Sequence, residues 1–344
     1  MGYRMDLKDA DRMFAKLQEE YEIWAPKRFV GKGRYSDTDL IKYARVDRAE
    51  EIEYREKSDF PAKEVLSPIT QSLFYFTEEE FIESKAGSKK LLIFMRPCDI
   101  HAQHHQEKIY LTNGGYEDIY YKRMNEKVKI VMMECGEGWD TCFCASMGTN
   151  KTDDYSMAVR FGEDGLEFQV KDHAFASYFE GMEECPFEPQ FVEKNELTLT
   201  VPEIPDKEVL TKLKEHPMWR QFDGRGISCG ACTVACSTCT CFTTPDIIYN
   251  ENRNVGQRKR TSASCPVKDF TDMAGGMGFR NRAGDRMRYK VLHKFHDYKA
   301  RFKDYHMCVG CGRCMDRCPE YISIVATVNK MADAIEEIKD GKQA

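Results

Sequence analysis

Two short apolar runs, each ending at a cysteine, stand out in the first half of the chain. They are KKLLIFMRPCD at 89–99 and KVKIVMMECG at 127–136, and their length predicts two buried strands. The segment between them, HAQHHQEKIYL, has a helical pattern, so the order strand–helix–strand indicates an α/β unit. Cys98 and Cys135, at the ends of the two runs, are therefore expected near the same carboxyl edge of a sheet.

Other segments carry clear helix or strand patterns. TEEEFIES at 77–84 begins like a helix, with Thr77 as N-cap and Glu80 completing a capping box. The pattern predicts an amphipathic helix at 4–20 and a strand-like piece at 22–30. It also predicts a basic helix at 285–303 and a final helix with alternating charges at 323–340.

The chain is long enough for two domains. Residues 153–204 suggest strands and turns, and Pro202 and Pro205 make a plausible linker before a helical, cysteine-rich part. We therefore expect an α+β or α/β domain over 1–205, followed by a mainly helical, ferredoxin-like domain over 206–344.

Composition narrows the possible environments. The formal net charge is −6, which argues against a protein-wide attraction to nucleic acid or to a membrane surface. No stretch approaches eighteen consecutive apolar residues, and the amino terminus lacks an apolar signal core. A cytoplasmic protein without nucleic-acid or membrane partners is expected.

The chain contains fifteen cysteines, and without a secretion signal their dense spacing indicates metal binding rather than disulfides. In CVGCGRCMDRCPEY, the cysteines 308, 311, 314 and 318 match C-x2-C-x2-C-x3-C-P. In this ferredoxin pattern the first three cysteines hold one [4Fe–4S] cluster and the fourth holds a neighbouring one. Gly310 and Gly312 permit the tight loop that the pattern needs.

An upstream block, GRGISCGACTVACSTCTCF at 224–242, aligns with the same pattern, but its first position is Gly226. The alignment assigns Cys236 to the cluster of Cys308, Cys311 and Cys314. It assigns Cys229 and Cys232, with Cys318, to a second cluster that is one ligand short. The missing ligand is expected to be one of Cys239, Cys241 and Cys265, although a water, a substrate or a partner residue could also complete the site.

A third group of thiols lies in the first domain, at Cys98, Cys135, Cys142 and Cys144. Its spacing matches no common ferredoxin pattern, so either a third [4Fe–4S] cluster, a zinc site or buried thiols could result. Cys185 has no partner in the sequence and is expected to be structural.

Residues 253–303 hold fourteen Lys and Arg against four Asp. Positive charge near anionic clusters stabilises their reduced form, so one interpretation is an electropositive shell around them. A solvated helix face with a few structural ion pairs is the other.

Several clusters in one chain, with no other cofactor motif, indicate an electron-transfer subunit; a zinc-stabilised binding module is the alternative from another class. MRPCDIHAQHH, ECGEGWDTCFCASMGTN, CGACTVACSTCTCF, GQRKRTSASC and CVGCGRCMDRCPEYISI together resemble the A subunits of anaerobic sulfite reductases. More broadly, they are similar to iron–sulfur subunits of sulfhydrogenase-type enzymes with a four-iron dicluster domain.

The resemblance covers essentially the whole chain. It implies a cytoplasmic complex in which a flavin subunit oxidises NADH and a sirohaem subunit reduces sulfite to sulfide, with this chain relaying electrons between them. It also implies that Cys98, Cys135, Cys142 and Cys144 act as a unit, which favours the third cluster. Gly226 departs from the ferredoxin-type motif, where a cysteine is expected. A relay subunit of a soluble hydrogenase is the alternative of the same class.

Overall fold

The computed structural model describes residues 2–85, 87–163 and 165–341. The chain forms two compact units, each built from separate segments. The sheet unit comprises Met1–Trp139, Thr149–Glu193 and Thr244–Thr261, and the cysteine unit comprises Asp140–Gly148, Lys194–Thr243 and Ser262–Ala344. The predicted division between residues 205 and 206 stays a prediction.

The sheet unit is built on an eight-stranded mixed sheet, with strand order β10-β1-β9-β8-β7-β6-β2-β3. Its strands are β1 (Gly2–Met5), β2 (Tyr21–Phe29), β3 (Leu40–Arg45), β6 (Lys90–Met95), β7 (Val128–Met133), β8 (Met157–Phe161), β9 (Leu166–Val170) and β10 (Glu183–Cys185). The pairs β2–β6, β6–β7 and β7–β8 are parallel. The two apolar runs are thus adjacent parallel strands, as predicted.

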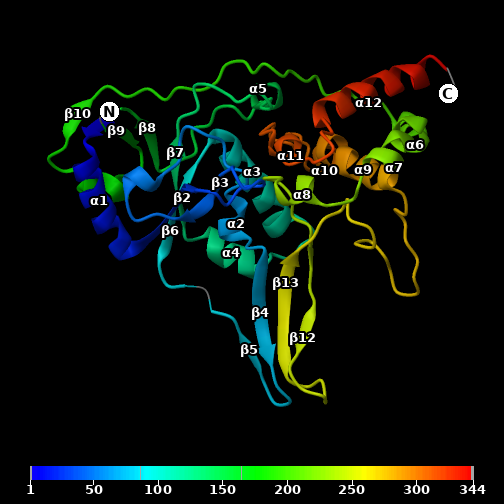
Figure 1. Ribbon diagram of the computed structural model, residues 1–344, viewed down its shortest axis with the longest axis horizontal. Helices are drawn as coiled ribbons and strands as arrows, with labels where there is room; N and C mark the ends of the chain where they lie inside the picture. Colours follow the sequence, from blue (N-terminus) through cyan, green and yellow to red (C-terminus); the bar gives the residue numbers. More distant parts are fainter. Residues whose placement is uncertain (1, 86, 164, 342–344) are drawn as a thin grey trace. The chain divides into compact units, whose positions relative to one another are not determined.

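Alternating side chains of β6 serve two cores, one on each face of the sheet. Leu91, Ile93 and Met95 belong to a core shared with α2 (Lys63–Leu66), α3 (Pro97–Glu107) and α4 (Ile119–Asn125). Leu92 and Phe94 belong to a core shared with α1 (Leu7–Glu20) and the short helix η3 (His173–Phe179). Helices on both faces give three layers, and the expected α/β architecture of this part is confirmed (Figure 1).

The amino-terminal helix α1 begins at Leu7, three residues later than predicted, because residues 2–5 pair with β9 and β10 as β1. Asp6 caps the helix by accepting a hydrogen bond of 2.8 Å from the Asp9 backbone N–H. Its buried side chains follow the 3.6-residue period and are Ala10, Met13, Phe14 and Leu17.

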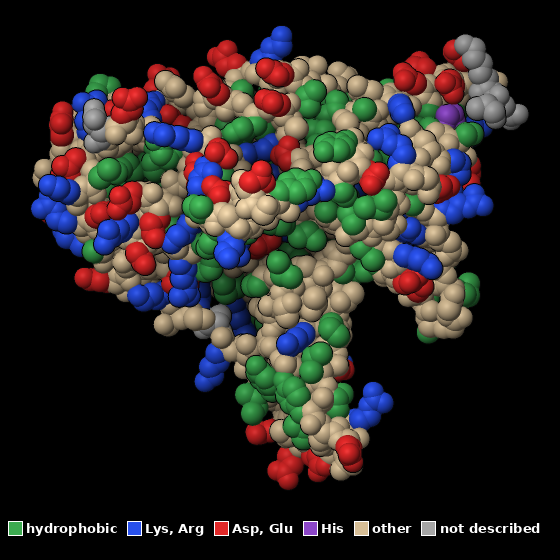
Figure 2. Space-filling model, viewed as in Figure 1, with side chains coloured by type: hydrophobic (Ala, Val, Ile, Leu, Met, Phe, Trp, Pro, Cys, Tyr) green, Lys and Arg blue, Asp and Glu red, His purple; other side chains and the backbone are tan. Residues whose placement is uncertain are grey.

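The helix predicted at 77–84 is wrong. This segment turns β4 (Thr70–Phe76) back into β5 (Phe81–Glu83), and β4 also pairs with β13 (Gly256–Ser262), which pairs with β12 (Asp246–Ile248). The Thr77 hydroxyl accepts from the backbone N–H groups of Glu79 and Glu80, so the expected capping residues stabilise a hairpin turn instead. Apolar side chains lie along these strands, and Phe81 is 76% exposed (Figures 1 and 2).

Short helices joined by irregular segments form the cysteine unit. Its elements are α5 (Cys144–Met147), α6 (Lys207–Glu215), η4 (Pro217–Arg220), α7 (Gln221–Arg225), α8 (Ala231–Val234), β11 (Phe242–Thr243), α9 (Ala283–Leu292), η5 (His293–Asp297), α10 (Tyr298–Phe302), α11 (Arg313–Asp316) and α12 (Ile324–Lys339). The predicted helices at 285–303 and 323–340 are confirmed. A mainly helical carboxyl-terminal domain is not confirmed, since β11, β12 and β13 also lie after residue 205.

Trp219 belongs to the hydrophobic core of the cysteine unit. It is fully buried, and its indole N–H donates to the Leu213 carbonyl at 2.7 Å, so its polar atom is satisfied. Phe222, Val291 and Val328 belong to the same core, which joins α7, α9 and α12 and so sets the position of the basic helix that carries the site's cations. Among the described residues, no helix is both long and apolar enough to cross a membrane.

Candidate metal centre

The carboxyl-terminal cysteine loop depends on two glycines in left-handed conformation, Gly310 at φ 65° and Gly312 at φ 75°. The Phe143 N–H donates to the Gly310 carbonyl at 2.8 Å. A Cβ on Gly310 would lie 2.6 Å from the Phe143 carbonyl carbon and oxygen. The close approach of this backbone and the positive φ both require glycine, which confirms the predicted role of the two residues.

The structure gathers the four thiols that the motif assigns to the first cluster. Burial, together with the nearby Cys236 and Cys311 sulfurs, raises the pKa of Cys308 to about 12. Burial also raises the pKa of Cys314 well above its ordinary value, and Cys308, Cys236 and Cys311 add to this effect. Four thiols this close oppose one another's ionisation, and bound iron would relieve that repulsion.

Polar side chains contact two of these sulfurs. Thr238 Oγ1 lies 3.5 Å from Cys236 Sγ, and Ser237 Oγ lies 3.5 Å from Cys311 Sγ. Arg313, which is only 2% exposed, donates to the Ser237 hydroxyl at 2.9 Å and so orients it. Hydrogen bonds and positive charge beside cluster sulfurs are two of the means by which proteins set cluster potentials.

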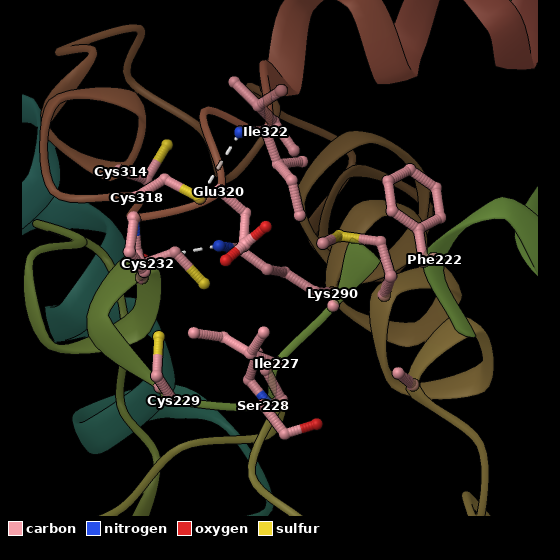
Figure 3. Close-up of a pocket in the computed structure, with 17 residues that line it drawn as sticks. Phe222, Ile227, Ser228, Cys229, Cys232, Lys290, Cys314, Cys318, Glu320 and Ile322 are labelled. Carbon is pink, nitrogen blue, oxygen red and sulfur yellow. Dashed lines mark hydrogen bonds between the residues drawn. The ribbon is translucent and has the colours of Figure 1, made fainter. Parts of the chain in front are cut away.

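The thiols assigned to the second cluster line one cavity, shown in Figure 3. Cys229, Cys232 and Cys318 border it, and its volume is about 660 Å³ when its opening to solvent is included. The Ile322 N–H donates to Cys318 Sγ at 3.3 Å. Gly226 also forms part of the wall, at the position where the motif expects a fourth thiol.

Cys239, Cys241 and Cys265 lie together in a second cavity, which Cys236 also borders. Cys241 hydrogen-bonds with both of the others: the bond with Cys239 lowers its pKa, but the bond with Cys265 and burial raise it more, to about 11. In the described part of the chain, the three cysteines are not among the residues that line the first cavity. That one of them completes the second cluster stays a prediction.

Two buried lysines, which the sequence reasoning did not single out, lie one helical turn apart beside these cysteines. Lys290 and Lys294 are 6% and 7% exposed. Lys290 Nζ donates to the Cys232 carbonyl at 3.3 Å, and Lys294 Nζ donates to the Thr238 carbonyl at 3.2 Å and to the Thr238 hydroxyl at 2.8 Å. The sequence signal that could have identified them is the KVLHK segment, in which two lysines four residues apart share one face of a helix with apolar neighbours.

The protonation of these lysines follows from their neighbours. Burial alone would lower the pKa of each, but the cysteine sulfurs outweigh it and raise both: Cys232 and Cys314 act on Lys290, and Cys236 acts on Lys294. A buried ammonium requires a negative partner, and an iron–sulfur cluster bound by thiolates is such a partner.

The basic stretch 253–303 therefore contains both kinds of residue considered for it: cations beside the cysteines, and exposed or structural basic side chains. Lys290 and Lys294 supply positive charge beside the thiols, while Lys299 lies exposed on the same helical run. Arg286 is structural, because its buried guanidinium donates to the Pro266 carbonyl at 2.9 Å and to the Ser228 hydroxyl at 2.8 Å.

The amino-terminal group of cysteines is divided between the two units. Cys98, in the first turn of α3, and Cys135, just after β7, belong to the sheet unit. In the cysteine unit, Cys142 Sγ lies 3.7 Å from the Cys311 carbonyl and Cys144 Sγ lies 3.6 Å from Asn195 Oδ1. A third cluster held by these four stays a prediction. Cys185 is buried at the end of β10.

The donor set is suited to iron–sulfur clusters: thiols in two neighbouring groups, hydrogen bonds to sulfur, and buried cations beside them. A zinc tetrahedron requires four ligand atoms that converge on one point. Within the described ranges, no three side chains of His, Cys, Asp or Glu are arranged to hold a single metal ion.

Comparisons with known proteins agree with this chemistry. Residues 225–322 match the family described as 4Fe-4S dicluster domain. The chain is also similar to "Sulfhydrogenase 2 subunit beta" of Pyrococcus furiosus, with 26% identity over 337 residues that cover 94% of this chain and 96% of the relative. No solved structure shows a significant match.

Proposed function

We propose that this chain is a non-catalytic electron-transfer subunit of an oxidoreductase complex, which passes single electrons through [4Fe–4S] clusters. The observation that carries the proposal is the arrangement of the matched dicluster region. Seven motif cysteines lie there in two neighbouring groups, with Lys290 and Lys294 buried beside them. A buried cation next to each group favours the reduced, more negative cluster and so lets the site accept an electron.

For the complex itself, we propose a sulfhydrogenase-type hydrogenase. The similar protein from Pyrococcus furiosus is named as a subunit of such an enzyme, and the similarity runs along nearly the full length of both chains. It therefore includes the segments of Cys98 and Cys135 as well as the dicluster region.

An NADH-linked anaerobic sulfite reductase is the second candidate. It rests on the resemblance of the cysteine motifs, and it implies a flavoprotein partner that oxidises NADH and a sirohaem partner that reduces sulfite. Both candidates assign the same relay chemistry to this chain and differ in the catalytic subunit.

Anaerobic purification of the chain with its natural partners tests both levels of the proposal. The relay function predicts a brown protein with at least eight irons per chain, as two four-iron clusters require. It also predicts electron paramagnetic resonance (EPR) signals on reduction. A nickel-containing partner would support the hydrogenase, and a sirohaem partner would support the sulfite reductase. A colourless, zinc-containing and fully folded chain would contradict the relay function and favour the binding module.

A further inference from the structure

The cavity assigned to the second cluster has no room for a cysteine side chain at residue 226, the first position of the motif. Gly226 ends helix α7, and its N–H donates to the Phe222 carbonyl at 2.8 Å. A Cβ at this position would lie 2.8 Å from the same Phe222 oxygen and 3.3 Å from the Ala283 Cβ. A cysteine would require a shift of the helix end, so this chain is packed for glycine where the pattern has a ligand.

A carboxylate also lines the same cavity. The backbone after Cys318 turns around its sulfur, because the Tyr321 N–H donates to the Cys318 carbonyl and the Ile322 N–H donates to Cys318 Sγ, each at 3.3 Å. Glu320 lies at the apex of this turn and lines the cavity. In Figure 3 the Glu320 side chain extends into the space that Cys318, Cys232 and Lys290 border.

Glu320 is available for a ligand. It is exposed, and among the residues that the structure describes its carboxylate has no hydrogen-bond or ion-pair partner. Lys290, which lines the same cavity, is hydrogen-bonded to the Cys232 carbonyl instead.

Other groups near the cavity are less suited to the fourth position. The Ser228 hydroxyl lines it but already accepts a hydrogen bond from Arg286, and a neutral hydroxyl is a weaker ligand for iron than a carboxylate. Cysteines 239, 241 and 265 line the other cavity and hydrogen-bond with one another. Cys314, although it reaches this wall, interacts with Cys236, Cys308 and Cys311.

We propose that the second cluster is held by Cys229, Cys232 and Cys318 and that Glu320 is the fourth ligand, bound through a carboxylate oxygen to the one iron without a thiolate. This assignment rests on the proposed electron-transfer function. It makes the two clusters chemically distinct: the first has four thiolates, and the second has one iron whose ligand exchanges readily.

The distinction has a defined redox consequence. A one-electron oxidant converts [4Fe–4S]²⁺ to [4Fe–4S]³⁺, which releases Fe²⁺ and leaves [3Fe–4S]⁺, so that charge and iron balance. Carboxylate oxygen holds iron less firmly than thiolate sulfur, because sulfur is the softer and stronger donor to an iron–sulfur core. The released iron is therefore the one bound by Glu320.

The test is controlled oxidation of the full chain, purified anaerobically, with one equivalent of ferricyanide per chain. We expect release of about one Fe²⁺ per chain and the EPR signal of a three-iron cluster, both reversed by Fe²⁺ and a reductant. In Glu320→Cys the rate of release should fall at least about tenfold, and in Glu320→Gln it should rise by a similar factor. Glu203→Gln and Glu203→Cys, at an exposed glutamate of the same unit, should behave as wild type.

Other results of the same experiment would contradict either the Glu320 assignment or the proposed function. Wild-type behaviour in both Glu320 variants, or no three-iron signal in the wild type, would overturn the assignment. The assignment would also be overturned if Cys239→Ser, Cys241→Ser or Cys265→Ser released iron faster than the wild type while Glu320→Gln did not. The four-thiolate cluster serves as the internal folding control, because its EPR signal after reduction should persist in every Glu320 variant. A wild-type chain without iron would instead refute the proposed function itself.

Discussion

Replacing Lys294 with methionine removes one buried positive charge and keeps most of the side chain's volume. The lysine is a cation at neutral pH, because the surrounding cysteine sulfurs raise its pKa. Its ammonium favours the reduced form of the cluster assigned to Cys236, Cys308, Cys311 and Cys314. Lys294→Met should therefore lower the reduction potential of that cluster.

The size of this effect follows from the geometry. Lys294 Nζ is 3.2 Å from the carbonyl of Thr238, two residues beyond Cys236, so one turn of backbone separates the charge from the cluster. Unit charges interact by about 4 kcal/mol at 4 Å with an effective dielectric constant near 20, and by about 2 kcal/mol at twice that separation. For one electron, about 1.4 kcal/mol corresponds to about 59 mV. We therefore expect a decrease on the order of 50–100 mV.

Redox titration followed by EPR measures the potential of each cluster directly. Lys299→Met is the matched control, since Lys299 lies on the same helical run but is exposed, and solvent and salt should limit its effect to about 20 mV or less. Iron content must equal that of the wild type in both variants. Equal shifts in the two variants, or a raised potential in Lys294→Met, would refute the assignment of Lys294 to the cluster's electrostatic environment.

Three further outcomes can be measured. Gly310→Ala should reduce iron content and destabilise the chain by more than about 2 kcal/mol in urea unfolding, because the strain of its positive φ adds to the contact with Phe143. Gly148→Ala, with φ 69° and open space around it, should cost only the strain of that φ, about 1–2 kcal/mol. The pKa of Asp172 is lowered by its hydrogen bonds with Lys129 (2.7 Å) and the Ala174 N–H (3.0 Å), so its contribution is present at neutral pH and is lost as pH falls through that lowered pKa. Asp172→Asn should accordingly speed hydrogen exchange in residues 172–179 at pH 7, as expected for a loss of about 1 kcal/mol of local stability, and should have little effect once the pH is below that lowered pKa. An equal effect at both pH values would exclude this ionic role. Removal of iron by a chelator under reducing conditions should increase proteolysis of the cysteine unit, whose buried lysines then lack anionic partners, and cleavage unchanged by chelation would show that this unit folds without iron.

Local chemistry in the sequence determined the ferredoxin-type loops, the buried parallel strands and the amphipathic helix α1. Each depends on residues that are neighbours along the chain: cysteines two or three apart around glycines, continuous apolar runs, or a 3.6-residue period. Thr77 and Glu80 show where such reasoning fails. They carry a helix-start pattern, but pairing of β4 with β13, nearly two hundred residues away, makes the segment a hairpin.

Only the tertiary structure decided which cysteines share a cavity and what faces them. The sequence pattern showed that Gly226 leaves a cluster one ligand short, but it could not show that Cys239, Cys241 and Cys265 line a different cavity or that Glu320 lines this one. It also could not distinguish Lys290 and Lys294 from the exposed lysines of the same helix. Burial and cavity membership depend on how segments distant in sequence pack together. When that packing removes water from a lysine, its charge is no longer screened and acts strongly on the groups beside it.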